Sequence, residues 1–129
     1  MKVTSKVNQK HLNDMQGVFQ RAQIKTVDAL KTDVQKSGTI PFGDTGNLQN
    51  KSLEIDNSKV NGGVISLVHT GLPYPRRLYF HPEYNFRKDK NENAGGKWFE
   101  PYLTGSKKEM PQKLFAKFVK KEKSNVIKD

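Results

Sequence analysis

Residues 8–37, NQKHLNDMQGVFQRAQIKTVDALKTDVQKS, place apolar side chains at steps of three, four or five residues. This spacing is close to the helical period and predicts one long helix over the whole stretch. Asn8 is a suitable N-cap, while Gly38 and then Pro41 provide a C-terminal stop. The apolar positions of this helix are Leu12, Met15, Phe19, Ala22, Val27, Leu30 and Val34.

The predicted helix is long for the size of the chain. About 30 residues at a rise of ~1.5 Å each make a rod of roughly 45 Å. The chain has 129 residues, of which 33% are hydrophobic, and this supports a single modest core. We therefore expect part of the rod to pack on a surface outside the subunit.

Residues 39–52, TIPFGDTGNLQNKS, predict a loop followed by a short helical turn. Asp44 or Thr45 can cap this turn, and Leu48 is expected to point inward.

A β-hairpin is expected next. Residues 53–60 form its first strand, and the dipeptide Asn61-Gly62 is a strong signal for a tight turn. Residues 64–68, VISLV, are almost continuously apolar, which favours a strand covered on both faces, with the long helix on one side.

The second half of the chain is less regular. Residues 76–80 follow two prolines and fit either a helical turn or a short strand, and residues 85–97, NFRKDKNENAGGK, predict a mobile polar loop. A last helix should begin at about Pro111, and residues 124–129 should fray. Its apolar stripe is Leu114, Phe115, Phe118 and Val119, and its opposite side carries Lys113, Lys117, Lys120 and Lys121.

These elements predict one domain over residues 1–129. Its class is α+β, with a long N-terminal helix packed on a small antiparallel sheet and a C-terminal helix. No stretch approaches the roughly 18 consecutive apolar residues of a membrane span, and the N-terminus has no apolar core of signal-peptide length. We expect a soluble protein without a membrane partner.

The net charge is +10, from 23 basic and 13 acidic residues. Such a balance favours partners with negative potential, including nucleic acid and acidic protein surfaces. A lysine-rich surface that only keeps the chain soluble is an equally good interpretation, because 19 of the basic residues are lysine.

The sequence contains no complete catalytic or metal-binding pattern. The absence of cysteine excludes a disulfide framework, a thiolate zinc site and a cysteine nucleophile. His11, His69 and His81 do not pair at ligand spacing, and Gly96-Lys97 lacks the other residues of a phosphate-binding loop. We therefore expect no catalytic residues, no metal and no cofactor.

Residues 74–86, YPRRLYFHPEYNF, concentrate six rings, counting His81, and two arginines. Three interpretations fit this composition. The first is a ribonuclease site and the second is a surface on which nucleic-acid bases stack. The third is a protein–protein hot spot. The ribonuclease interpretation uses His69, Arg76, Arg77, His81 and Tyr84.

Three motifs within residues 41–105 resemble the minor capsid proteins of long-tailed bacteriophages, small neck proteins of the head–tail joining class. The first is the DTGxL stretch at residues 44–48. The second is the Tyr-x-Arg-Arg-Leu-Tyr block at residues 74–79. The third is Asn93-Ala94 followed by Trp98-Phe99-Glu100.

The resemblance implies a structural, non-enzymatic part of the connector between portal and tail. Such a protein works in the virion, after assembly in the bacterial cytoplasm, as a ring of identical subunits. Its partners would be neighbouring neck, portal or tail proteins, with DNA passing non-specifically through the channel. The alternative is a small basic nucleic-acid-binding protein or toxin-like ribonuclease. The expected interface residues are Tyr74, Arg76, Arg77, Tyr79, His81, Tyr84, Phe86 and Trp98, and the expected loop motif is Asp44, Thr45 and Gly46.

Overall fold

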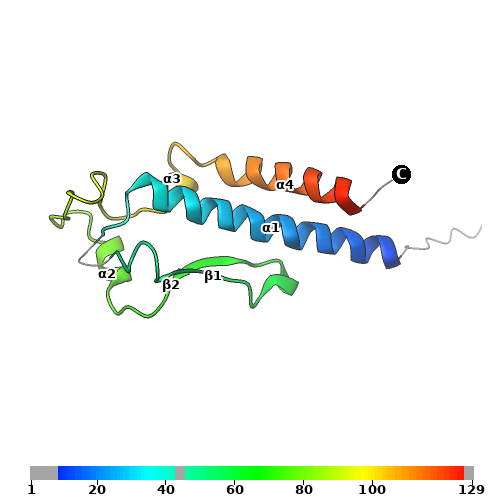
Figure 1. Cartoon of the computed structure of the whole chain (residues 1–129), viewed down its shortest axis with the longest axis horizontal. Helices are drawn as coiled ribbons and strands as arrows, with labels where there is room; N and C mark the ends of the chain where they lie inside the picture. The colour runs from blue at the N-terminus through cyan, green and yellow to red at the C-terminus, as the bar shows by residue number, and fades with distance from the viewer. Residues whose placement is uncertain (1–8, 43–45, 127–129) are drawn as a thin grey trace, which may run out of the picture.

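The computed structural model describes residues 9–42 and 46–126. Its architecture is α+β, as the sequence predicts, with a long N-terminal helix, a two-stranded antiparallel sheet and a C-terminal helix (Figure 1). The elements in chain order are α1 (Gln9–Ser37), β1 (Leu53–Asp56), the 3₁₀ turn η1 (Val60–Gly62), β2 (Ser66–His69), α2 (Pro75–Tyr79), α3 (Glu100–Leu103) and α4 (Met110–Val126).

Helix α1 forms the central layer of the molecule. It matches the predicted long helix, and Gly38 ends it in the left-handed conformation, with φ of 69°. Ser37 reinforces this end because its hydroxyl donates to the Val34 carbonyl at 2.7 Å. The predicted cap Asn8, like Asp44 and Thr45, lies outside the described residues.

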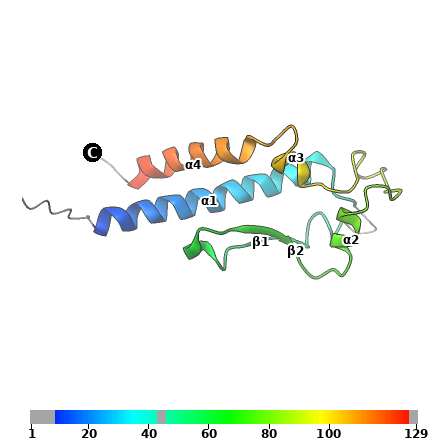
Figure 2. The same cartoon turned by 180° about the vertical axis from the view of Figure 1, so that it is seen from behind.

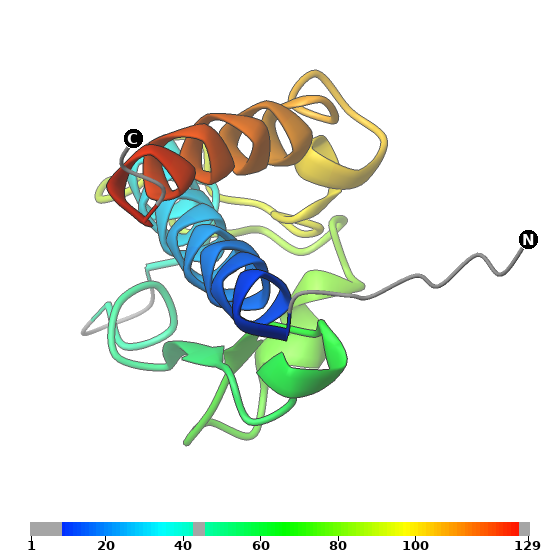
Figure 3. The same ribbon diagram turned by 90° about the vertical axis from the view of Figure 1, so that its right-hand side faces the viewer.

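Two layers flank α1. Helix α4 runs along one side of it and the β1–β2 sheet lies on the other, as Figures 1 and 2 both show. The view along the long axis separates the same three layers (Figure 3). The predicted faces of α4 are confirmed, since its apolar stripe is half-buried and its four lysines are exposed. The helix reaches Val126, and residues 127–129 lie outside the description.

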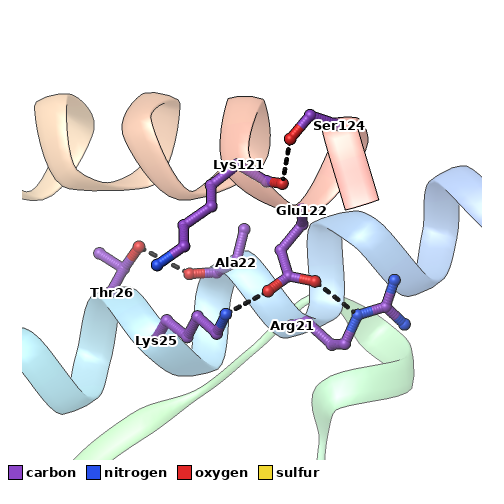
Figure 4. Close-up of polar contacts among 7 residues, drawn as sticks. All are labelled: Arg21, Ala22, Lys25, Thr26, Lys121, Glu122 and Ser124. Carbon is purple, nitrogen blue, oxygen red and sulfur yellow. Dashed lines mark hydrogen bonds and ion pairs between the residues drawn. The ribbon is translucent and has the colours of Figure 1, made fainter. Parts of the chain in front are cut away.

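A buried carboxylate fixes α4 against α1. Glu122 is only 6% exposed and reaches across to α1 (Figure 4). Its Oε2 accepts from Arg21 Nε at 3.0 Å, and its Oε1 accepts from Lys25 Nζ. Hydrogen bonds from Lys25 and Arg21 hold the pKa of Glu122 below its usual range. Because both oxygens are bound, rotation of α4 about its axis would leave a buried charge without partners.

We predict that Glu122→Gln lowers the melting temperature, because the amide cannot balance two cations and turns an N–H₂ group toward one of them. Glu109→Gln is the matched control. Glu109 is exposed and pairs with Lys113 one helical turn away at 3.4 Å, a contact of about 0.5 kcal/mol at most. Thermal unfolding followed by circular dichroism compares the variants, and equal melting temperatures would contradict a structural role for Glu122.

The hairpin forms, but its predicted tight turn is wrong. Asp56 pairs with Ser66, so residues 57–65 connect the strands instead of Asn61-Gly62 alone. The left-handed residue is Gly63, with φ of 79°, which closes the η1 turn. Asp56 also accepts from the Ser58 N–H at 3.0 Å, a local turn that ends β1 early.

Helix α1 holds this connection. Gln20 Nε2 donates to Asn61 Oδ1 at 3.2 Å, and Gln23 Nε2 donates to the Gly63 carbonyl at 2.6 Å. These long-range contacts cannot be anticipated from a turn propensity, and they explain why a wide connection replaces a two-residue turn.

Strand β2 is less covered than its sequence suggests. All of its residues are half-buried and Val64, before the strand, is 48% exposed. The expectation of burial on both faces is therefore not met. The reason is that α1 packs on the sheet from one side, and the sheet has only two strands.

The core lies where α1, the sheet and the residues before α3 meet. Leu48 points inward, as predicted, and is 2% exposed. Trp98 is the largest fully buried side chain, at 1% exposure. The core cluster consists of Val34, Ile40, Leu48, Leu53, Trp98 and Tyr102.

Residues 91–98 join two distant parts of the chain. The Gly95 N–H donates to the Thr39 carbonyl at 3.0 Å, and the Lys97 N–H donates to the Tyr79 carbonyl at 2.9 Å. Asn91 Nδ2 also donates to the Ile40 carbonyl at 2.7 Å. The predicted polar loop is confirmed as irregular, but these anchors are not foreseen by the sequence. Mobility of residues 85–97 stays a prediction.

Gly96 makes this junction possible by lying against the backbone of α2. A Cβ added there would come within 2.9 Å of the Tyr79 carbonyl oxygen and 3.1 Å of the Leu78 carbonyl oxygen. Both contacts are with main-chain atoms, so the neighbours cannot move aside cheaply.

We predict that Gly96→Ala costs about 1–3 kcal/mol of unfolding free energy, the usual cost of overpacking. Gly95→Ala is the control, since its Cβ would meet only the Asn93 carbonyl oxygen, at 4.0 Å. Urea unfolding followed by Trp98 fluorescence measures both. If the two variants unfold at the same urea concentration, the junction is not the constraint that we describe.

Candidate functional site: the arginine and aromatic surface of α2

Residues 75–79 resolve one of the open alternatives, because they form helix α2 rather than a strand. Pro75 occupies its first turn, where a missing N–H costs nothing. The helix turns Leu78 and Tyr79 toward the core and leaves Arg76 and Arg77 exposed. The ring-rich stretch is thus divided between the interior and the surface.

Two of the expected interface residues serve the interior. Trp98 is 1% exposed and belongs to the core, so it offers almost no surface to a neighbouring subunit. Tyr79 is half-buried and packs edge-on against Trp98, with ring centroids 4.9 Å apart. Their role in the free chain is to support α2 from below.

Arg76 and Phe80 form the first exposed pair. The Arg76 guanidinium carbon lies 5.9 Å from the centroid of the Phe80 ring, and Phe80 is 58% exposed. The site prediction omits Phe80. The signal that could have found it is the four-residue spacing from Arg76, which puts both on one face of a helix.

Arg77, His81 and Tyr84 form a second group at the surface, in which Arg77 is exposed and the two rings are half-buried. The His81 and Tyr84 rings stack, with centroids 4.7 Å apart and an interplanar angle of 7°. The Arg77 guanidinium carbon lies 5.9 Å from the centroid of the Tyr84 ring, and Arg77 Nε donates to the Tyr84 hydroxyl at 3.3 Å. This hydrogen bond raises the pKa of Arg77 further. Phe86 borders the group, and its ring centroid lies 6.4 Å from that of Tyr84.

These contacts hold a charged, aromatic surface in place before any partner arrives. Side chains that are already ordered lose less entropy on binding than free ones. Tyr74, 40% exposed, lies just before α2 and extends the apolar part of this surface. We call the residues Tyr74, Arg76, Arg77, Phe80, His81 and Tyr84 the α2 surface.

The predicted loop motif contributes a structural residue. Gly46 is buried, with φ of 75°, and a Cβ there would come within 2.7 Å of the Phe42 ring. Its N–H donates to the Phe42 carbonyl at 3.0 Å. Gly46 therefore shapes the turn before Leu48 and presents no side chain to a partner.

His69 is tied into the core by a directional chain of hydrogen bonds. Its Nε2 accepts from Trp98 Nε1 at 3.1 Å, because the indole N–H can only donate. Nδ1 then carries the proton and donates to Ser52 Oγ at 3.0 Å, and Ser52 Oγ donates to the Leu48 carbonyl at 2.8 Å. Both ring nitrogens are occupied, so His69 cannot serve as the acid or base of the ribonuclease interpretation in this conformation.

Burial lowers the pKa of His69 below 6.5, and an interaction with the Leu48 carbonyl offsets part of that shift. The unfolded chain therefore binds a proton more readily than the folded one. Stability should be full above about pH 6.5 and should fall as the pH drops through the folded pKa.

We predict that His69→Gln removes this loss between pH 7 and pH 5, at the cost of lower stability at pH 7. His81→Gln is the control, because it replaces a histidine at the surface, and this variant should still lose stability between pH 7 and pH 5. Urea unfolding at a series of pH values gives the slope for each protein. A wild-type free energy of unfolding that is flat between pH 7 and pH 5 would contradict the neutral assignment of His69.

The α2 surface does not include a metal centre. Among residues 9–42 and 46–126 we find no group of three or more histidine or carboxylate side chains able to hold a metal ion. Within the same residues no helix has the length and apolar character to cross a membrane.

Comparison of the chain with protein-family models, curated protein sequences and solved structures gives no significant match.

Proposed function

We propose that this chain is a structural subunit of the head–tail connector of a long-tailed bacteriophage and assembles as a ring. The observation that carries the proposal is a pair of unlike apolar surfaces, one at each end of an elongated molecule. Exposed apolar area on a small domain commonly marks a site of protein association.

The first surface lies on the N-terminal half of α1. Leu12 is 48% exposed and Phe19 is 45% exposed. With Met15 and Val60 they line a hollow of about 470 Å³ between α1 and η1. Leu12 and Met15 precede Val18, the first fully buried residue among those described in α1. This exposed apolar end supports the expectation that α1 packs on another subunit.

The second surface is the α2 surface, at the other end of the long axis (Figure 1). The two surfaces differ in character, since the first has only neutral lining residues and the second carries two arginines. Contacts between unlike surfaces of identical subunits are head-to-tail, and such contacts produce rings when the rotation closes.

Non-specific nucleic-acid binding is the second candidate, and the exposed lysine face of α4 favours it. Lys117, Lys120 and Lys121 have no acidic partner among the described residues. The neighbouring carboxylate, Glu122, pairs with Arg21 and Lys25 of α1 instead. A row of lysines attracts phosphates without reading sequence. In a connector the same face would tolerate DNA in the channel.

We predict that Arg77→Ala leaves the chain folded but prevents its incorporation into particles. An exposed arginine held over a tyrosine is typical of an interface hot spot. In a phage that encodes this chain, electron microscopy should then show heads and tails that accumulate separately. Lys123→Ala, which removes an exposed charge on α4, is the control and should assemble normally.

The competing functions give different results in the same preparation. Normal assembly of the Arg77→Ala variant, together with loss of salt-sensitive binding to duplex DNA in a Lys117→Ala/Lys121→Ala variant, would favour nucleic-acid binding and contradict the connector. Cleavage of RNA by the wild-type chain, abolished by His81→Ala, would favour the ribonuclease.

A further inference from the structure

The outer edge of β2 presents free backbone groups. The Thr70 N–H donates to the Ser52 carbonyl at 2.7 Å, and the register pairs Leu53 with His69. In an antiparallel pair, residues that bond to the partner strand alternate with residues whose N–H and C=O point away. Val68 therefore bonds to β1, while Leu67 and His69 direct their backbone groups outward. Within residues 9–42 and 46–126, no backbone hydrogen bond to either is present.

A hollow of about 330 Å³ lies along this edge. It touches Leu67, Val68 and His69 in succession. Because successive side chains of a strand point to opposite faces, contact with all three places the hollow beside the strand and not over one face. Its other walls are Pro75, Arg76, Tyr79, Phe80, Trp98 and Phe99.

We propose that this edge binds an extended, acidic segment of another protein, which adds a third strand to the sheet next to β2. Strand addition of this kind draws affinity from main-chain hydrogen bonds and specificity from side chains placed in adjacent pockets. Here an apolar side chain of the segment enters the aromatic hollow, and a carboxylate of the segment pairs with Arg76.

The hollow is ready for such a segment. Its aromatic walls are fixed, since Tyr79 packs on Trp98 at 4.9 Å and on Phe99 at 5.9 Å between centroids. Phe80, 58% exposed, stands at the rim with Arg76 over its ring. A side chain inserted there gains apolar contact without rearrangement of the site.

Charge at the hollow favours an acidic segment over a neutral or basic one. The chain carries a net charge of +10, which favours a segment of opposite charge. Arg76 is exposed and is the charged side chain among the residues that line the hollow. The local excess is positive, and a carboxylate at the rim would be attracted to it. This proposal does not rest on ring assembly, and it can be tested on the isolated chain.

The probes are three blocked eight-residue peptides that alternate valine and threonine around one phenylalanine and differ in two flanking residues. The flanking residues are aspartate, asparagine or lysine. We expect the aspartate peptide to bind, the asparagine peptide to bind at least about tenfold more weakly, and the lysine peptide not to bind. Trp98 is the single tryptophan and lines the hollow, so its fluorescence reports binding.

Amide exchange followed by NMR tests the geometry. The Leu67 and His69 amides should exchange fast in the free chain and slowly with the aspartate peptide, whereas the Val68 amide should be protected in both states. Two further versions of the aspartate peptide carry N-methyl groups on either the odd-numbered or the even-numbered backbone nitrogens. Only every second N–H of the added strand faces β2, so one version should lose binding and the other should keep it.

Arg76→Glu should weaken binding of the aspartate peptide by at least about tenfold and should strengthen binding of the lysine peptide. Lys88→Glu, which makes the same charge change on the exposed loop, should alter neither. The proposal is overturned if no peptide binds at millimolar concentration, or if binding leaves Leu67 and His69 exchanging as before. Equal binding of the two N-methylated peptides also overturns the proposal. None of these results would contradict the proposed assembly into a ring, which is tested separately by the Arg77→Ala variant.

Discussion

The fold depends on the burial of Trp98 between segments that are distant in the sequence. Gly96 brings the backbone before Trp98 against the carbonyl oxygens of Leu78 and Tyr79, and the indole N–H then reaches His69. The hydrogen-bond chain continues through Ser52 to the turn that carries Leu48. One side chain thus fixes α2, β2 and the end of α1 relative to each other, and loss of any link leaves a buried polar group unpaired.

Helix α1 turns this local arrangement into an elongated molecule. Among the α1 side chains whose burial the structure describes, the buried ones lie between Val18 and Val34, while Leu12 and Phe19 are exposed. Glu122 fixes α4 along the same helix through Arg21 and Lys25. The rod therefore holds its exposed apolar end far from α2. A molecule with this shape can offer different surfaces to two neighbours without competition between them.

The sequence predicts the parts of the fold that rest on local periodicity. The bounds of α1 follow from its apolar spacing and from Gly38, and the two faces of α4 follow from its alternation of Leu114 and Phe115 with Lys113 and Lys117. The parts that depend on distant contacts could not be predicted. The hairpin connection is set by Gln23 of α1, a contact that turn propensities do not include.

The same reason explains the uneven prediction of the site. A helical turn over residues 76–80, one of the two alternatives that the sequence allows, puts residues four apart on one face, so the pair of Arg76 and Phe80 was accessible from sequence. The burial of Trp98 was not, because its neighbours Gly96 and Lys97 suggest a loop, and only the approach to Tyr79 makes the segment interior.

The two arginines of α2 show how a five-residue helix serves more than one contact. Arg76 lies over Phe80, beside the edge of β2, whereas Arg77 lies over Tyr84, on the side of the loop. Adjacent residues of a helix point about 100° apart, so the two guanidiniums face different surroundings. Tyr79 and Trp98 support both from within. A partner strand at β2 and a neighbouring subunit at Tyr84 would therefore share one rigid support, and a change in Tyr79 packing would affect both contacts together.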